Sequence, residues 1–220
     1  MNTLIGILGV LSVLVSTGDS LSCIKCLGSS KETCIGSSVT CPSDNLCANG
    51  YSLTNAAGTL TPVFNRDCGP RNQCNLTGSV TFNIGVVRVA TTCCSTDNCD
   101  PGIPTLPSNN IQQNGLTCRT CYSGNSLSCY TSETIQCKGV ENKCLLMEKQ
   151  LSGTFFSKEA LRGCATDTYC SLLGTQTASY DGLNIDMKVF CTSGTNSVHG
   201  GFFLSTTAFL VLLKYLFFLN

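Results

Sequence analysis

The sequence predicts an all-β, disulfide-rich protein built from two small tandem domains. It contains 18 cysteines in 220 residues, and they form two clusters that each open with C-x-x-C and repeat the same order of short and long gaps. Its 21 glycines and 6 prolines are scattered, and no segment carries helix caps at both ends. Such a cysteine density is typical of an oxidising compartment, where disulfides compensate for a small core. The first cluster holds Cys23, Cys26, Cys34, Cys41, Cys47, Cys68, Cys74, Cys93, Cys94 and Cys99, and the second holds Cys118, Cys121, Cys129, Cys137, Cys144, Cys164, Cys170 and Cys191.

Residues 1–20 are interpreted as a secretory signal peptide. An apolar run from Leu4 to Val15 is too short to cross a bilayer comfortably, and small residues follow it at Gly18 and Ser20. We expect cleavage after Ser20, so that the first domain occupies residues 21–100.

Within the first domain, residues 80–89 predict a strand. Val80, Phe82 and Ile84 would share one face, and Gly85 interrupts the alternation as a β-bulge would.

Residues 101–115 predict an extended linker, because they contain three prolines and end in a polar stretch. The second domain, residues 116–196, opens with Leu-Thr-Cys as the first opens with Leu-Ser-Cys. In it, residues 144–149 and 155–161 flank Ser152-Gly153, which predicts a hairpin.

The last segment indicates a glycosylphosphatidylinositol (GPI) anchor signal. Small residues and a polar spacer precede the apolar stretch Phe202–Leu219, which is the order that such a signal requires. Asn196 is the expected attachment site, with Ser193 and Gly194 as alternatives, and residues 197–220 would be removed. A transmembrane helix is the competing interpretation, although Lys214 within the apolar run disfavours it.

The charges are balanced in each domain. Residues 21–100 carry five Lys/Arg and five Asp/Glu, and residues 116–196 carry seven of each. The sequence has no stripe of basic residues of the kind that binds nucleic acid, so contact with nucleic acid is not predicted.

The cysteine pattern resembles that of the urokinase-receptor and lymphocyte-antigen-six family. The most specific part is the ending Cys93-Cys94-x4-Cys99, and the likeness covers both domains, residues 21–191. The resemblance implies that each domain is a three-finger fold, which snake neurotoxins also use. It implies disulfides that join Cys23 to Cys47, Cys26 to Cys34, Cys41 to Cys68, Cys74 to Cys93, Cys94 to Cys99, Cys118 to Cys144, Cys121 to Cys129, Cys137 to Cys164 and Cys170 to Cys191.

The alignment of the two domains leaves no odd thiol. When Cys191 is matched with Cys93, Thr192 and Ser197 stand where the last bridge of the first domain has its cysteines. The family usually has Asn after the last cysteine, whereas this chain has Asp100, so a looser edge is expected there.

Neither catalysis nor a cofactor is predicted. A hydrolytic triad needs a base, and the single histidine, His199, lies in the segment expected to be removed. The carboxylates Asp44, Asp67, Glu141 and Glu148 are interpreted as solvated surface charges. Zinc is disfavoured, because C-x-x-C pairs in a secreted chain form disulfides.

The expected partner is therefore an extracellular or membrane protein. The resemblance implies recognition through the finger loops or through the concave face between neighbouring domains. The candidate contact residues are Tyr51, Phe64, Met147, Phe155 and Phe156, although packing within the protein is an equally good explanation of each.

One N-glycosylation sequon, Asn75-Leu76-Thr77, follows Cys74. We expect a glycan at Asn75.

The resemblance implies a GPI-anchored receptor or co-receptor on the outer leaflet of the plasma membrane. A gamma-type phospholipase inhibitor is the alternative, because two-domain members of the superfamily include such inhibitors. Modulation of an ion-channel receptor, known for single-domain relatives, has weaker support.

Overall fold

The computed structural model describes residues 20–29, 33–174, 176–180 and 182–193. This part of the chain is almost entirely β-structure, with nine disulfides, which confirms the predicted fold class. We call the two domains the first and the second module.

The first module consists of three hairpins. Their strands are arranged in the order β5-β6-β3-β4-β1-β2, so the middle hairpin lies between the other two. The elements are β1 (Ser22–Gly28), β2 (Ser37–Thr40), β3 (Asn45–Ala56), β4 (Thr59–Pro70), the 3-10 turn η1 (Arg71–Gln73), β5 (Thr77–Phe82) and β6 (Gly85–Cys94).

The second module repeats this plan with a detached first hairpin. Strands β7 and β9 pair as a separate two-stranded sheet, whereas β12, β13, β10 and β11 follow one another, with β8 paired to β11. The elements are β7 (Gln113–Arg119), β8 (Cys121–Ser123), β9 (Thr134–Lys138), β10 (Lys143–Gly153), β11 (Ser157–Ala165), α1 (Asp167–Leu173), β12 (Gln176–Tyr180) and β13 (Leu183–Ser193).

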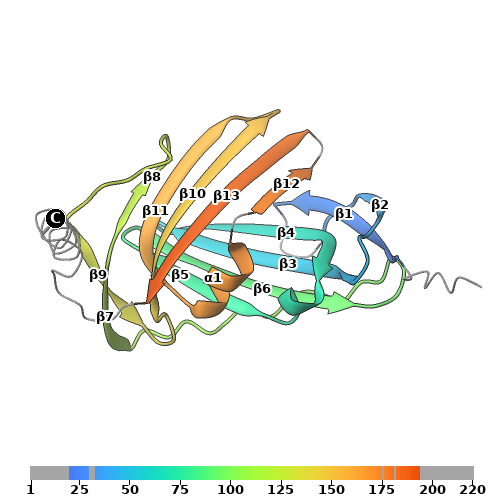
Figure 1. The fold of residues 1–220 in the computed structure, drawn as a ribbon. Helices are drawn as coiled ribbons and strands as arrows, with labels where there is room; N and C mark the ends of the chain where they lie inside the picture. Colours follow the sequence, from blue (N-terminus) through green and yellow to red (C-terminus); the bar gives the residue numbers. More distant parts are fainter. Residues whose placement is uncertain (1–19, 30–32, 175, 181, 194–220) are drawn as a thin grey trace, which may run out of the picture.

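The two modules share one 11-stranded sheet, because β5 of the first pairs antiparallel with β11 of the second. We call this junction the seam (Figure 1). Gly163 permits the close approach, because a Cβ there would lie 2.1 Å from the carbonyl oxygen of Thr81. The two modules therefore form one continuous sheet and are not two independent domains joined only by a linker.

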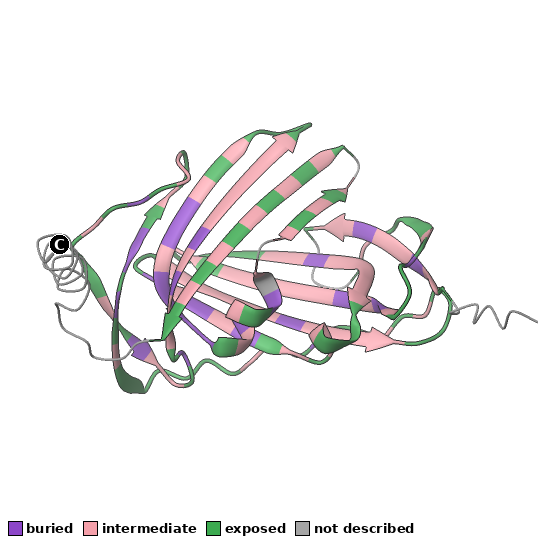
Figure 2. Cartoon of the chain, viewed as in Figure 1, coloured by how far each residue is buried: buried purple, intermediate pink, exposed green. Residues whose placement is uncertain are grey.

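The largest apolar core also belongs to both modules. Val80 and Phe82 of the first pack with Leu145, Met147 and Leu161 of the second. Figure 2 shows buried positions on the strands on both sides of the seam, in addition to those elsewhere in the molecule. We call this cluster the shared core.

Each module has in addition a small core made mainly of disulfides. In the first it is built on Cys23, Cys41 and Cys47, and in the second on Cys118, Cys137 and Cys164. Within each module these small clusters are thus mostly sulfur, with Phe64 of the first module as an aromatic side chain buried outside the shared core, and the largest apolar cluster among the described residues lies between the modules.

The nine disulfides are the pairs that the family resemblance implies, and none of the described cysteines is free. In the first module Cys94 pairs across the strands with Cys47, and in the second Thr192 pairs in the same way with Cys144. Thr192 therefore occupies the position of Cys94, while Ser197 lies outside the described residues.

The predicted bulge at Gly85 is wrong. Residues 80–89 form the end of β5, a turn at Asn83-Ile84 and the start of β6. Gly85 is needed because a Cβ there would lie 2.1 Å from the carbonyl oxygen of Asn55 on β3. Val80 and Phe82 are buried, whereas Ile84 is exposed in the turn.

The expected absence of a helix is also wrong. The helix α1 begins after Thr166, whose hydroxyl accepts a hydrogen bond from the Tyr169 amide, and it ends before Gly174. Thr166 also exchanges hydrogen bonds with the backbone of Ser79 across the seam. The predicted hairpin in the second module is present as β10 and β11.

The predicted linker, residues 101–115, has no regular structure up to residue 112, and β7 begins inside it at Gln113. Pro104 is buried, whereas residues 108–111 are exposed.

Candidate protein-binding surface

Two exposed phenylalanines lie at the end of the β10–β11 hairpin. Phe155 is 60% exposed and Phe156 is 76% exposed. We call residues 154–156 the aromatic tip. Aromatic side chains that are already presented to solvent can be buried by a partner, and they are common anchors of protein interfaces.

The aromatic tip is tied to the neighbouring hairpin. The amide of Thr154 donates a hydrogen bond to the carbonyl oxygen of Gly182, between β12 and β13, at 3.3 Å. Gly153 has a φ of +104°, and a Cβ there would lie 2.0 Å from the same oxygen. The turn is thus restrained by the pairing of β10 with β11 and by its contact with the turn before β13. A restrained turn loses little conformational freedom when a partner binds it.

Two of the five candidate contact residues were assigned wrongly. Phe64 is 1% exposed, because β4 lies between β1 and β3. Met147 is 7% exposed, because β10 extends to Gly153 and places Met147 in the middle of the strand, in the shared core. Tyr51 is half-buried. Only the two phenylalanines of the tip are therefore fully available to a ligand.

The far ends of the two modules touch, so that the curved sheet returns toward itself. Strand β12 contacts β1 (Figure 1). The Nζ of Lys25 lies 5.1 Å from the centre of the Tyr180 ring. Lys25 also forms an ion pair with Asp67 at 3.3 Å. Burial, and then the nearby Asp67 carboxylate, raise the pKa of Tyr180.

One face of strand β13 is apolar. Along β13 half-buried and exposed residues alternate, with Leu183, Ile185, Met187 and Val189 on the half-buried face. Met187 and Val189 pack against the shared core. The opposite, exposed face of β13 is polar except for Phe190, which is 52% exposed. The sequence analysis did not identify Phe190, although the alternation along this segment is visible in the sequence.

Asp100 is well fixed, which contradicts the expectation of a loose edge. Its Oδ1 accepts hydrogen bonds from the Asn49 amide at 2.8 Å and from the Gly102 backbone at 3.0 Å. Arg66 lies 3.6 Å from its Oδ2. The Gly102 amide, then Asn49, together with Arg66, lower the pKa of the Asp100 carboxyl.

Glu141 is a further correction, because it is not a solvated surface charge. It is 4% exposed, and its Oε1 accepts hydrogen bonds from the hydroxyls of Ser79 and Thr81 across the seam, each at 2.8 Å. Burial raises the pKa of the Glu141 carboxyl, although these hydrogen bonds and the nearby Lys138 act in the opposite direction. Nothing in the local sequence distinguishes Glu141 from an exposed glutamate.

The raised pKa of Glu141 predicts a pH-dependent stability. The folded state binds the proton more tightly than the unfolded state, so the contribution is fully present below the ordinary pKa of 4.5 and is lost as the pH rises through the raised value. Because glutamine mimics the neutral acid, wild type should lose stability relative to Glu141→Gln between acidic and neutral pH. Denaturant unfolding at several pH values measures this difference. Glu133→Gln, at an exposed carboxylate, is the control, and a difference that stays constant or grows in favour of wild type with pH would contradict the assignment.

Two groups of sulfur atoms have the compactness of a metal site, one at Cys23, Cys41 and Cys68 and one at Cys118, Cys137 and Cys164. Every one of these sulfurs belongs to a disulfide. A disulfide sulfur is not a thiolate, so neither group offers ligands to zinc.

The processing signals fall mostly outside the described residues. This is true of residues 1–19, of Gly194 and Asn196, and of the apolar stretch Phe202–Leu219. Within the described ranges no helix is long and apolar enough to cross a membrane. Asn75 is exposed, with a φ of +56°, and its glycosylation stays a prediction.

Comparison with known proteins identifies both modules. Residues 19–102 and 114–199 each match the model of the u-PAR/Ly-6 domain. A phospholipase A2 inhibitor 25 kDa subunit from Naja kaouthia is 30% identical over 177 residues, which cover 78% of this chain and 94% of that protein. Phospholipase A2 inhibitor NAI from Notechis ater is 29% identical over 162 residues, or 72% of this chain and 80% of that protein.

The urokinase plasminogen activator surface receptor of Mus musculus is 30% identical over 142 residues, which cover 63% of this chain. The match spans 42% of the length of that receptor. Among solved structures, the crystal structure of mouse TEX101 matches with a TM-score of 0.34 and 16% identity, over 78% of this chain and 98% of that one.

Proposed function

Because the chain belongs to the u-PAR/Ly-6 domain family, we propose that it is a non-catalytic receptor or co-receptor that binds an extracellular protein. A GPI anchor attached at Asn196 would hold it on the outer leaflet of the plasma membrane. The terminal order of small residues, spacer and apolar stretch supports the anchor. A receptor without a cytoplasmic segment would signal through membrane partners.

The observation that carries the protein-binding role is the aromatic tip. Phe155 and Phe156 are exposed although they are large and apolar, and the turn that holds them is fixed by Gly153 and Gly182. Rigid aromatic side chains lose little entropy when they are buried in an interface. A ligand that covers the tip would also meet the neighbouring turn between β12 and β13, to which Thr154 is hydrogen-bonded.

Inhibition of a phospholipase A2 is the second candidate function. Its support is the two-module length, since the match covers 94% of the Naja kaouthia inhibitor subunit but only 42% of the mouse receptor. In this case the protein would act by covering the enzyme, and the aromatic tip would be the first contact to examine.

Release by phosphatidylinositol-specific phospholipase C tests the anchor. Cells would display the full chain with an epitope inserted after Ser20, and the epitope would be followed in cells and medium. Enzyme-dependent release is the expected result. Protein that remains on the cells would indicate a transmembrane tail, and protein in the medium without enzyme would favour a soluble inhibitor.

The released protein also separates the two functions. Binding to secreted phospholipase A2 would be measured for wild type, for the double variant Phe155→Ser and Phe156→Ser, and for Phe190→Ser as the control with an exposed phenylalanine elsewhere. The receptor proposal predicts no binding to the phospholipase. Binding and inhibition that only the tip variant loses would establish the inhibitor function instead.

A further inference from the structure

The chain contains two Asn-Gly pairs, Asn49-Gly50 and Asn114-Gly115. Asparagine is a thermally labile residue, and a glycine after it leaves the next backbone nitrogen unshielded by a Cβ. That nitrogen can attack the side-chain amide carbon of the asparagine and displace ammonia. Because the two pairs have the same local chemistry, the structure decides which of them reacts.

The first pair is protected inside the first module. Asn49 is 1% exposed, in the middle of β3, which pairs with β4 on one side and with β6 on the other. Its Nδ2 donates to the Oδ1 of Asp100 at 2.8 Å and to the carbonyl oxygen of Gly102 at 2.9 Å. Attack on this side chain requires local opening of the sheet, so the pair is protected while the module is folded.

The second pair lies in an irregular and exposed part of β7. The strand bulges here, because residues 114–116 stand against the single residue Cys137 of β9. Gly115 has a φ of +89°, and a Cβ there would meet nothing within 4 Å. Since β7 and β9 form a separate two-stranded sheet, a small movement of this bulge requires no opening of the 11-stranded sheet.

The Asn114 side chain is folded along the peptide that would attack it. Its Oδ1 accepts a hydrogen bond from the Leu116 amide at 3.0 Å. This contact holds the side-chain carbonyl alongside Gly115, whose nitrogen is the nucleophile, and such proximity favours an intramolecular attack. The attack turns Oδ1 into an oxyanion, and the Leu116 amide is already in place to stabilise it.

We propose that Asn114-Gly115 is a site of spontaneous deamidation, which loosens the seam as the protein ages. Hydroxide removes the Gly115 amide proton, the nitrogen forms a bond to the Cγ of Asn114, and Nδ2 takes a proton from water and leaves as ammonia. Water then opens the resulting succinimide ring to give aspartate, or isoaspartate where the main-chain carbonyl is hydrolysed. The overall change consumes one water and releases one ammonia, with no oxidant or reductant.

The nitrogen that leaves has a structural role. Nδ2 of Asn114 donates to the carbonyl oxygens of Gly139 at 3.1 Å and of Glu141 at 3.0 Å. An ionised aspartate has only acceptors, so both carbonyls lose their donor and face a negative charge. Isoaspartate in addition lengthens the main chain of β7 by one carbon atom.

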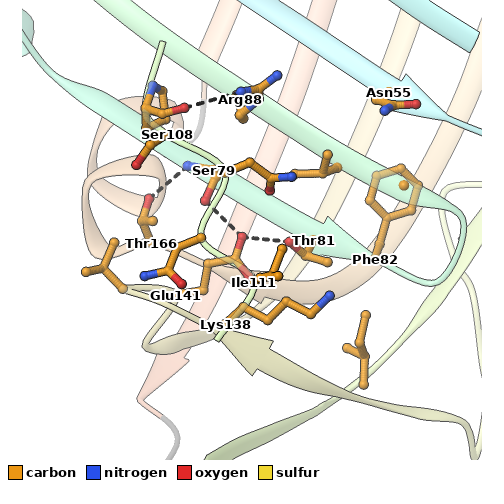
Figure 3. A pocket seen from close by; sticks show the side chains of 18 of the residues that line it. Asn55, Ser79, Thr81, Phe82, Arg88, Ser108, Ile111, Lys138, Glu141 and Thr166 are labelled. Carbon is orange, nitrogen blue, oxygen red and sulfur yellow. Dashed lines mark hydrogen bonds between the residues drawn. The ribbon is translucent and has the colours of Figure 1, made fainter. Parts of the chain in front are cut away.

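The segment that Asn114 holds leads directly to the seam. It connects β9 with β10, and the Oε1 of Glu141 accepts hydrogen bonds from Ser79 and Thr81 of the first module (Figure 3). Loss of the contact to the Glu141 carbonyl therefore frees a residue that joins the two modules. Because the reaction must break both hydrogen bonds of Nδ2, it is slower in the folded protein than in an unfolded chain, and the product accumulates gradually.

Mass spectrometry tests the reaction. The full chain, purified in detergent from expressing cells, is incubated at mildly alkaline pH in water labelled with heavy oxygen, which marks only the carboxylates formed during the incubation. Rates in the reduced and denatured chain give the intrinsic reactivity of each pair. After this normalisation, residue 114 should gain label at least about tenfold faster than residue 49 in the folded protein, because the buried pair reacts only through local opening. No labelling at residue 114, or equal rates at both sites, would overturn the proposal.

Hydrogen exchange tests the effect on the seam. Asn114→Asp reproduces one product and should accelerate exchange about tenfold in residues 77–82 and 139–145. Asn125→Asp, at an exposed asparagine elsewhere in the second module, should leave the exchange of these residues unchanged. Asn114→Gln keeps an amide but would have to close a larger ring, so it should gain no label at residue 114. Exchange of Asn114→Asp at the wild-type rate would refute the effect on the seam even if deamidation occurs, and labelling of Asn114→Gln as fast as wild type would refute the succinimide route.

Discussion

Replacing Phe82 by alanine should destabilise both modules together by about 3–5 kcal/mol, the usual cost of removing a buried phenylalanine. Phe82 ends β5 in the first module, is 4% exposed and packs in the shared core, with its ring centre 6.1 Å from that of Tyr122 in the second module. Loss of the ring would leave a void on both sides of the seam. Denaturant unfolding with intact disulfides should show a single transition at lower denaturant concentration.

Phe190→Ala is the matched control, because this phenylalanine is 52% exposed on β13. Its replacement should change the free energy of unfolding by no more than about 0.5 kcal/mol. Two separate transitions, with only the first module affected by Phe82→Ala, would show that the modules fold independently and would refute the shared core.

The expected cooperativity follows from where the apolar area lies. Within a module, the buried cluster consists mostly of cystines, such as those formed by Cys23 and Cys41. Such small units bury too little surface to be stable by packing alone. The largest cluster of buried aliphatic and aromatic side chains instead lies between the modules, where β5 and β11 pair. Disulfides thus stabilise each module locally, and the apolar core stabilises the pair.

The sequence was sufficient for features that depend on the order of cysteines along the chain. The repeated spacing predicted two modules, and the family resemblance implied the pairs that the structure contains, including the replacement of Cys94 by Thr192. The β10–β11 hairpin was also visible, because a Ser-Gly pair between two possible strands is a local signal, although β10 extends through Gly153 and the turn lies at residues 154–156.

Features that depend on contacts between modules could not be predicted. Val80 and Phe82 have the same alternation whether they face water, their own module or the other one. Gly85 was misread for a similar reason within the first module, because it is required by the approach of β3, which lies about 30 residues earlier in the chain. Glu141 is buried at the seam, where the hydroxyls of Ser79 and Thr81 in the other module donate hydrogen bonds to it. The family resemblance concerns the cysteine pattern within each domain. It carried no information on how the two domains of this chain pack against each other.

Cys41→Ser should abolish normal display of the protein on the cell surface. The Cys41–Cys68 disulfide spans 27 residues, and Cys41 is 2% exposed in the cystine core of the first module. Closing a loop of this size contributes about 3–4 kcal/mol through the unfolded state. That is a large part of the roughly 5–15 kcal/mol that stabilises a typical domain. Flow cytometry of cells that carry an epitope after Ser20 measures the loss, and the double variant Cys41→Ser, Cys68→Ser separates loss of the bridge from exposure of a free thiol.

The chain supplies its own control for this experiment. Cys94 and Cys99 are only five residues apart, so their disulfide closes a short loop, and in the second module Thr192 occupies the place of Cys94 without such a bridge. Because the second module forms the same strand pairing at that position, the double variant Cys94→Thr, Cys99→Ser should retain most of its surface display. Normal display of Cys41→Ser would refute the argument that long-range bridges decide folding here. Equal loss in both double variants would instead show that every bridge of the first module is required, whatever its span.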